Sequence, residues 1–365
     1  MTKLVVKQIL SHMLRIGSWM LYFVTLLSAY GGYLSPDRWT LPAIGVLFFP
    51  YLAIATLIVG VIWLIRRRYL IGGIGIAVLM ACGPTFMQAV PFRFGHTASN
   101  PQRTFKMVTF NCLHMNDIKN KQPKYNRSLN FLIHCDADFI CLQEFYSFTS
   151  FEIPKRYKSQ VDSLLKIYPY YSTDGGRQME FLSKYPFEQI NIKLEDNMKY
   201  GNCAAYRLEV DGQELTVVNV HLPSYLLTDN ERNIITEARS RAGVKNSIRE
   251  FEGSVYRKMK NAFQTRAKVS KAIAEYAESV KGNVIVCGDF NDVPGSWSYR
   301  NFTKRGFEDA YAQTGFGHMI TYNQHLMWFH IDQILYKGDL IPLYVRKERL
   351  SASDHYPLVA EFEFI

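Results

Sequence analysis

Polar residues of the kinds that bind metal ions and move protons follow a series of short apolar runs in this sequence of 365 residues. The polar residues at or just beyond the ends of these runs are Asn111, Gln143, Glu144, His221, Asp289, Asn291, Asp332, Asp354 and His355. Each of them alone fits a turn or a helix cap. Their repetition at six strand ends indicates one polar pocket instead, because such loops are exposed and held in place by a rigid sheet.

The residue types in this set restrict the chemistry. Carboxylate and amide oxygens are hard ligands that suit Mg²⁺ or Mn²⁺, whereas zinc prefers more His or Cys. Two histidines near such an ion can stabilise charge on a phosphoryl group, and a further carboxylate can activate water. No GxxxxGK[ST] run is present to bind a nucleotide for phosphoryl transfer. The set therefore predicts hydrolysis of phosphate esters.

The elements that must position these residues are short strands alternating with helices. The expected strands are rich in Val and Ile and are bounded by polar residues or Gly. They cover residues 107–111, 139–142, 215–220, 284–287, 331–336 and 357–362. Helices are expected over 127–134 and within the long polar stretch 229–280. This alternation predicts one α/β catalytic domain, which we place at residues 104–365.

Three long stretches near the N-terminus contain no charged residue. Each is long enough to cross a hydrocarbon core of roughly 30 Å as a helix, since about 20 helical residues suffice. A signal peptide followed by buried core helices is the alternative, but a cleavable signal explains only one stretch. The sequence thus predicts a membrane anchor over residues 1–95, with transmembrane helices at about 16–36, 41–65 and 69–91.

Positive charges set the expected orientation of this multi-pass anchor. Arg66, Arg67 and Arg68 lie between the second and third spans, and loops rich in Arg and Lys tend to stay in the cytoplasm. The N-terminus, which carries Lys3 and Lys7, is then also cytoplasmic. Three spans place the catalytic domain on the outer side, which is the periplasmic face in a bacterium.

The formal net charge of +10 is unevenly distributed. Residues 231–274 carry eleven Lys/Arg against four Glu, whereas the rest of the soluble part is slightly acidic. A global basic field of the kind that draws proteins to nucleic acid is therefore absent. The basic segment is either a solvated helix face or a flank that meets anionic substrate or lipid. The six cysteines form no CxxC pair, which indicates free thiols rather than a zinc cluster.

The motifs TFN, LQE, NVHLPS, GDFN, HIDQIL and SDHYPL, in this order, resemble the endonuclease/exonuclease/phosphatase superfamily. The resemblance runs from about Lys106 to the C-terminus. It implies a four-layer α/β sandwich, in which two packed, mostly antiparallel sheets are flanked by helices. The superfamily includes pancreatic-type deoxyribonucleases, abasic-site endonucleases, sphingomyelinases and inositol polyphosphate phosphatases.

The resemblance also implies a metal site that holds Mg²⁺, with Mn²⁺ as the alternative. Glu144 matches the main metal ligand of the family. Asn111 is expected beside the metal and the phosphate, and Asp354 at or near a metal position.

Roles in the reaction follow by the same resemblance. His221 matches a histidine that contacts the phosphate in the deoxyribonuclease and sphingomyelinase branches; abasic-site endonucleases have a tyrosine-containing motif there, so that branch is disfavoured. Asp289 is expected to orient or deprotonate the attacking water, with Asn291 steadying that geometry. Asp332 is expected to hydrogen-bond His355 and to favour its charged form against the transition-state oxyanion.

Arg266 is the one substrate-binding residue that we predict outside these motifs, because the family often has an arginine on the helix before GDFN. The substrate class stays open between nucleic acid, phospholipid and sugar or inositol phosphate, and the lipid bilayer is the other expected partner. No protein partner is indicated. The alternative function is a catalytically inactive membrane binding or scaffold protein, which the intact set of polar residues disfavours.

Overall fold

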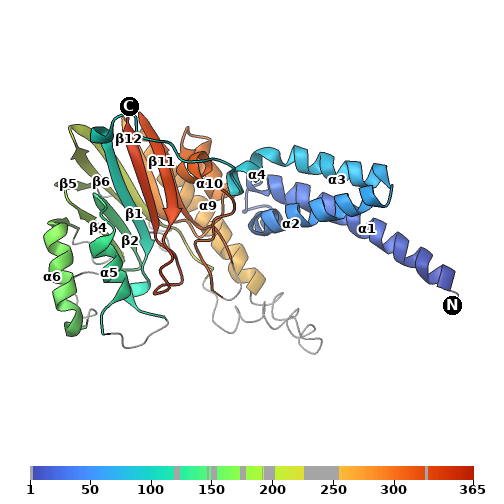
Figure 1. The fold of residues 1–365 in the computed structure, drawn as a ribbon, viewed down its shortest axis with the longest axis horizontal. Helices are drawn as coiled ribbons and strands as arrows, with labels where there is room; N and C mark the ends of the chain where they lie inside the picture. The colour runs from blue at the N-terminus through green and yellow to red at the C-terminus, as the bar shows by residue number, and fades with distance from the viewer. Residues whose placement is uncertain are drawn as a thin grey trace.

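Two six-stranded sheets pack face to face and carry helices on their outer faces, while four N-terminal helices project from one side (Figure 1). This is a computed structural model, and it describes residues 3–118, 124–145, 148, 154–172, 178–190, 192, 202–225, 255–324 and 328–365. The C-terminus lies at the edge of the sandwich and the N-terminus at the far end of the helical bundle (Figure 1).

The first sheet has the strand order β11-β12-β1-β2-β4-β3. Its strands β1 and β2 are parallel, and all its other pairs are antiparallel. The strands are β1 (Thr104–Asn111), β2 (Phe139–Gln143), β3 (Tyr170–Tyr171), β4 (Met179–Ser183), β11 (Leu340–Lys347) and β12 (Leu358–Phe364).

The second sheet has the order β5-β6-β7-β8-β10-β9, again with one parallel pair, β7 and β8, among antiparallel ones. Its strands are β5 (Phe187–Ile190), β6 (Asn202–Val210), β7 (Gln213–His221), β8 (Asn283–Asp289), β9 (Glu308–Asp309) and β10 (Asp332–Lys337). All six strands expected from the sequence are present, and the expectation of mostly antiparallel sheets is confirmed.

Three apolar layers hold the sandwich together, because residues that alternate along a strand face opposite sides of the sheet. Between the sheets, Phe181 stacks on Tyr206 with ring centroids 4.2 Å apart. The first sheet packs on α5 (Arg127–His134) and α6 (Lys158–Ile167), and the second on α9 (Tyr256–Ser279) and α10 (Trp297–Thr303). The four-layer α/β sandwich is therefore confirmed.

Helix α9 covers the described part of the helix expected over 229–280. Residues 226–254, which hold most of the basic segment, lie outside the described residues. A helix, α11 (Ala310–Thr314), and three 3₁₀ turns, η2 (Pro101–Arg103), η3 (Leu113–Met115) and η4 (Lys155–Tyr157), complete the domain. All six cysteines are free thiols.

The N-terminal bundle consists of α1 (Lys3–Tyr30), η1 (Gly31–Tyr33), α2 (Thr40–Ile65), α3 (Tyr69–Ala81) and α4 (Gly83–Ala89). Two of its helices are long and apolar enough to cross a membrane, over Gln8–Tyr33 and Thr40–Ile65. The third expected span, 69–91, is not one straight helix but the pair α3 and α4, bent by 61°. The break falls just before Pro84, which lies in the first turn of α4, where its missing N–H costs no helical hydrogen bond.

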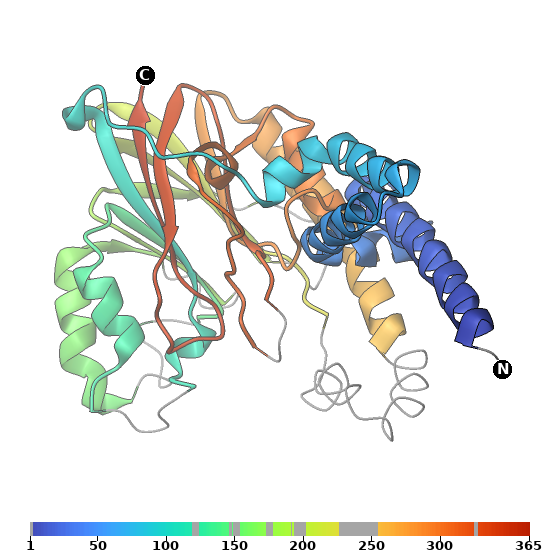
Figure 2. The same cartoon turned by 45° about the vertical axis from the view of Figure 1, so that its right-hand side comes forward.

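The bundle packs closely against the α/β sandwich on the side of α9 and α10 (Figure 2). A Cβ added to Gly32 would lie 1.8 Å from the carbonyl oxygen of Gly295, so only glycine allows this approach. The guanidinium of Arg300 lies 3.7 Å from the ring centre of Tyr33.

The polar connection after the bundle is also fixed to the domain, where the backbone of His96 donates to Leu343 at 2.7 Å. The carboxylate of Glu363 accepts from the backbone of Ser99 at 2.8 Å.

Candidate active site

The ends of the parallel strand pairs bring the predicted residues together at one edge of the sandwich. Asn111, the last residue of β1, is in register with Gln143 of β2 in the first sheet. In the second sheet His221 of β7 is in register with Asp289 of β8, which in turn pairs with Asp332 of β10. The two strands of a parallel pair have their C-terminal ends at the same edge of the sheet. The pairs β1–β2 and β7–β8 both end at the same edge of the sandwich, so their polar residues meet there.

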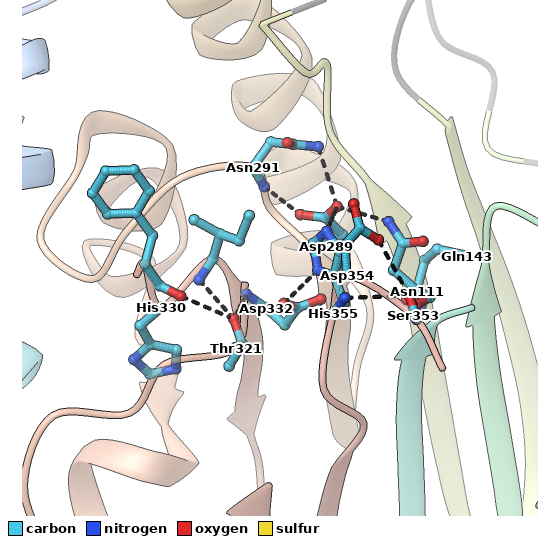
Figure 3. A network of polar contacts seen from close by, with 12 residues as sticks. Asn111, Gln143, Asp289, Asn291, Thr321, His330, Asp332, Ser353, Asp354 and His355 are labelled. Atoms are coloured by element: carbon cyan, nitrogen blue, oxygen red, sulfur yellow. Dashed lines mark hydrogen bonds and ion pairs between the residues drawn. The ribbon is translucent and has the colours of Figure 1, made fainter. Parts of the chain in front are cut away.

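Asn111 joins the two sheets. Its Nδ2 donates to Asp289 Oδ2 at 3.0 Å (Figure 3). It also donates to Glu144 Oε1 at 3.0 Å, so the amide lies between two carboxylates. Its Oδ1 accepts from the backbone of Leu113 at 3.3 Å, and a carbonyl oxygen retains a second lone pair. The amide therefore fixes the separation of the carboxyl groups of Glu144 and Asp289.

Asp289 is buried and held by the residues that follow it. Its Oδ1 accepts from the backbone of Asn291 at 2.7 Å, and its Oδ2 accepts from the side-chain amide of Asn291 at 3.3 Å. Gly288 before it has φ +137°, and a Cβ there would lie 2.0 Å from the carbonyl oxygen of Val220. The tight turn of the GDFN motif thus aims one carboxylate oxygen into the site.

The predicted hydrogen bond between Asp332 and His355 is present, with 2.9 Å between Oδ2 and Nδ1. The other ring nitrogen, Nε2, lies 3.7 Å from Asp289 Oδ2. Burial alone would lower the pKa of His355, but the carboxylates of Asp332 and Asp289 outweigh it and raise that pKa well above its usual value. His355 is thus suited to remain cationic beside an anionic substrate.

His221, at the end of β7 in the second sheet, faces the carboxylates of Glu144 and Asp289. Its Nε2 lies 3.8 Å from Glu144 Oε1 and 3.7 Å from Asp289 Oδ2, beyond hydrogen-bond distance. The side chain is partly exposed, which leaves it accessible to a substrate. The Nε2 atoms of two histidines therefore approach Asp289, one from the end of β7 and one from the loop before β12.

Three polar residues that we did not single out from the sequence support this arrangement. Ser353 Oγ donates to the backbone oxygen of Asn111 at 2.8 Å, and it lies 3.3 Å from Asp354 Oδ1. Thr321 Oγ1 accepts from the backbone of Asp332 at 3.1 Å. Asn219 Oδ1 accepts from the side-chain amide of Gln143 at 2.7 Å. The SDH motif signals Ser353 and the NVHLPS motif contains Asn219, whereas Thr321 sits in a segment with no distinguishing pattern.

Consecutive left-handed residues shape the loop next to Asn111. Leu113, His114 and Met115 have φ between 47° and 56°, and Glu144 has φ 53°. The backbone of His114 donates to the carbonyl oxygen of Glu144 at 2.7 Å, which ties the two strand ends together. Such conformations cost about 1–3 kcal/mol each for residues other than Gly, and they concentrate at functional sites.

The donor set fits a divalent cation. Ligand atoms of Glu144, His221 and Asp289 lie within 4.8 Å of one another, and so do those of Asp289, Asp332 and His355. Carboxylate oxygens predominate, which suits Mg²⁺ or Mn²⁺. Asp354 belongs to neither group among the described residues. Its place in the metal site, like that of Asn111, stays a prediction.

Arg266 lies beside the site rather than in its open part. The side chain is fully buried, its Nε donates to Pro223 O at 3.0 Å, and its Nη1 lies 3.5 Å from Asp292 Oδ2. Burial raises the pKa of Asp292, and Arg266 opposes that change. These contacts connect α9 to the loop after β8; a contact with substrate stays a prediction.

Two parts of the chain match known families. Residues 108–355 match the family model described as "Endonuclease/Exonuclease/phosphatase family". Residues 11–88 match "Domain of unknown function (DUF8431)". A comparison with curated proteins found no match.

Solved structures of similar topology include a D. rerio TDP2 humanized by 14 mutations, with 18% identity, TM-score 0.48 and coverage of 72% of this chain and 99% of the other. An endonuclease/exonuclease/phosphatase from Beutenbergia cavernae has 12% identity, TM-score 0.46 and coverage of 72% of both chains. Beta toxin from Staphylococcus aureus has 17% identity, TM-score 0.42 and coverage of 70% and 99%.

Proposed function

The chain belongs to the endonuclease/exonuclease/phosphatase family, and on that premise we propose that it is a membrane-anchored, divalent-metal-dependent hydrolase of phosphate esters. One observation carries the proposal. The Asn111 amide joins Glu144 and Asp289, with the Asp332–His355 pair beside them, at one edge of two sheets.

The residues that would hold the cation are Glu144, Asn111 and Asp354, with Asp289 at their edge. A bound Mg²⁺ would draw charge from the phosphate oxygens and help position the ester. The Asn111 amide holds the carboxyl groups of Glu144 and Asp289 at a fixed spacing by donating to both. The chain itself thus preorganises two oxygen donors of the kind that a small, hard cation prefers.

Asp289 is placed to take a proton from the attacking water. Its two oxygens accept from Asn291, so the carboxylate cannot rotate. A fixed carboxylate orients the water and accepts its proton as the oxygen bonds to phosphorus. Asn291 acts by holding Asp289, and its own amide is anchored on Leu222 O at 2.9 Å.

His355 is placed to stabilise the charge that develops on the phosphoryl oxygens. Asp332 fixes its ring through Nδ1, which leaves Nε2 directed toward Asp289 and the substrate. A preorganised cationic donor stabilises such charge more in a buried site than in water. His221 supplies a second Nε2 on the other side, and we assign it to the phosphate of the substrate.

The membrane anchor is part of the same proposal. Two long apolar helices and the bent pair α3–α4 support a multi-pass anchor over residues 1–95, followed by the catalytic domain over 104–365. The turn between α2 and α3, which carries Arg66–Arg68, lies at the end of the bundle away from the sandwich (Figure 1), which supports a cytoplasmic N-terminus and an outer catalytic domain.

The experiment that tests the proposal uses the full chain in detergent. We expect hydrolysis of bis(p-nitrophenyl) phosphate or p-nitrophenyl phosphate with Mg²⁺ or Mn²⁺, and none with a chelator. Asp289→Asn should lower the rate by at least about a hundredfold, the usual contribution of a general base. The control is Asp136→Asn, because the Asp136 side chain is 81% exposed.

Folded protein that binds Mg²⁺ but turns over neither ester, nor an oligonucleotide, nor a phospholipid would contradict the enzymatic proposal. That result would favour the binding or scaffold alternative. Equal activity of wild type and Asp289→Asn would instead overturn the role assigned to Asp289.

A further inference from the structure

An aromatic wall leads from the active site to the second membrane helix. We define this wall as Tyr322, Trp328 and Phe329 of the catalytic domain together with Phe48 and Tyr51 of α2. From it we infer that the substrate is a phosphate ester of a membrane lipid, whose apolar chain lies along the exposed outer part of this wall. The inference rests on the proposed function and names the substrate class of the same site.

The wall begins at a residue of the active site. The ring of Tyr322 lies edge-on to His355 with centroids 5.1 Å apart. Tyr322 and Phe329 are joined by two backbone hydrogen bonds, of 3.0 and 3.2 Å. A group bound at His355 is therefore next to the first aromatic ring of the wall.

The wall ends on α2. The rings of Phe329 and Phe48 have centroids 5.8 Å apart, and the hydroxyl of Tyr51 donates to the backbone oxygen of Trp328 at 2.6 Å. Ala43, Val46 and Leu47 of α2 belong to the same buried cluster as Tyr322 and Phe329. The membrane helix is thus a structural neighbour of the catalytic histidine, with one layer of aromatic side chains between them.

The outer part of the wall is accessible. Trp328 is 47% exposed, Phe48 42% and Tyr51 38%, although all three are large apolar or amphipathic side chains. The exposed apolar positions of α2 continue from there at helical spacing, through Ile54 and Ile58. An acyl chain in the bilayer therefore meets one continuous apolar surface from the membrane-facing side of α2 to Trp328.

A nucleic acid fits this surface poorly. Its backbone needs a row of cations, whereas the wall is apolar and aromatic. Lys347 reaches the same region, but its ammonium donates to Ile320 O at 2.9 Å and lies 5.1 Å from the ring centre of Tyr356. A lipid phosphate ester, by contrast, can place its charged phosphate at the metal site and its apolar chain against the aromatic side chains of the wall.

The reaction is hydrolysis and needs no further reactant. The water oxygen forms a bond to phosphorus, and the ester P–O bond breaks with its electron pair on the leaving oxygen. One proton of the water passes to Asp289, and the leaving oxygen takes a proton from solvent. The charged product leaves, while the apolar product stays in the bilayer.

The test compares a lipid with a water-soluble ester in the same preparation. The full chain is reconstituted into phosphatidylcholine vesicles containing phosphatidylglycerol and Mg²⁺, and lipid hydrolysis is measured by mass spectrometry. Bis(p-nitrophenyl) phosphate serves as the soluble probe. We expect Phe48→Ala and Trp328→Ala to lower the ratio of lipid to soluble turnover by about tenfold, the effect of removing one well-placed apolar contact.

The matched control is Phe23→Ala, because Phe23 is 66% exposed on α1 and lies outside the wall. An unchanged ratio in both wall variants would overturn the inference. So would wild-type protein that hydrolyses the soluble ester or an oligonucleotide but neither lipid. Wild-type protein that hydrolyses none of these substrates would instead count against the proposed function itself.

Discussion

Replacing Asp332 by asparagine should remove most of the hydrolytic activity and leave the fold intact. The carboxylate accepts from His355 Nδ1 at 2.9 Å, and both side chains are almost fully buried. Asparagine keeps the shape and removes the charge from this hydrogen bond. A hydrogen bond to a charged group contributes about 1.5–3 kcal/mol. Since about 1.4 kcal/mol corresponds to tenfold in rate, kcat/KM should fall by about 10- to 100-fold.

The measurement is a double-mutant cycle with His355→Gln. Initial rates on bis(p-nitrophenyl) phosphate are taken for the wild type, both single variants and the double variant, with Mg²⁺ in excess. If Asp332 acts through His355, adding Asp332→Asn to His355→Gln should change the rate by less than about twofold. Asp339→Asn is the matched control, because Asp339 is exposed just beyond the other end of β10.

Additivity in this cycle would refute the reasoning. If Asp332→Asn lowered the rate equally with and without the imidazole, Asp332 would act on the cation or the substrate directly. A single variant with nearly wild-type kcat/KM would show that the hydrogen bond has no role in the rate-limiting step. Thermal unfolding of each variant separates both results from loss of the fold.

Three further predictions concern the metal, the buried ion pair and pH. Glu144→Gln should weaken cation binding, so excess Mg²⁺ or Mn²⁺ should partly restore its rate; absence of rescue at any concentration would argue against Glu144 as the principal ligand. Arg266→Met should lower stability by about 3–5 kcal/mol by leaving Asp292 buried and unpaired, and adding Asp292→Asn should recover part of this loss in thermal unfolding. Burial raises the pKa of Asp309 to about 6, so its folded state holds a proton that the unfolded state releases near pH 4. The stability from this group is present below about pH 4 and lost as pH rises through about 6, so Asp309→Asn should stabilise the protein more at pH 7 than at pH 4; an equal effect at both values would contradict the shift.

The sandwich could be predicted from the sequence because its strands are short, apolar and punctuated by polar residues. The same pattern located Asn111 and Asp289, since a residue that ends a central strand must lie at the sheet edge, whereas His355 was located by the SDH motif in the loop before β12. Helix α5 has the bounds expected from its pattern, Arg127–His134. The elements that depend on local sequence periodicity, namely the strands and helix α5, were therefore predicted correctly.

Contacts between distant segments were not predictable in this way. The left-handed turn at Leu113–Met115 has no glycine to signal it, and tertiary contacts hold it in place. The 61° break in the third apolar stretch falls at Cys82, just before Pro84, and hydropathy alone does not register it. The burial of Arg266 follows from its pairing with Asp292, a residue 26 positions away in the chain. Such effects depend on which surfaces meet, and single-sequence patterns do not report that.

The close approach of Gly32 to Gly295, together with the fixed segment after the bundle, means that the catalytic domain does not swing on a tether. If the bundle is embedded in a membrane as proposed, its rigid contact with the domain fixes the distance between the active site and the bilayer. An enzyme held at one height samples its substrate by sideways diffusion within a thin layer. Its rate then depends on how many esters occupy each unit of membrane area, and dilution of the surrounding solution leaves that rate unchanged.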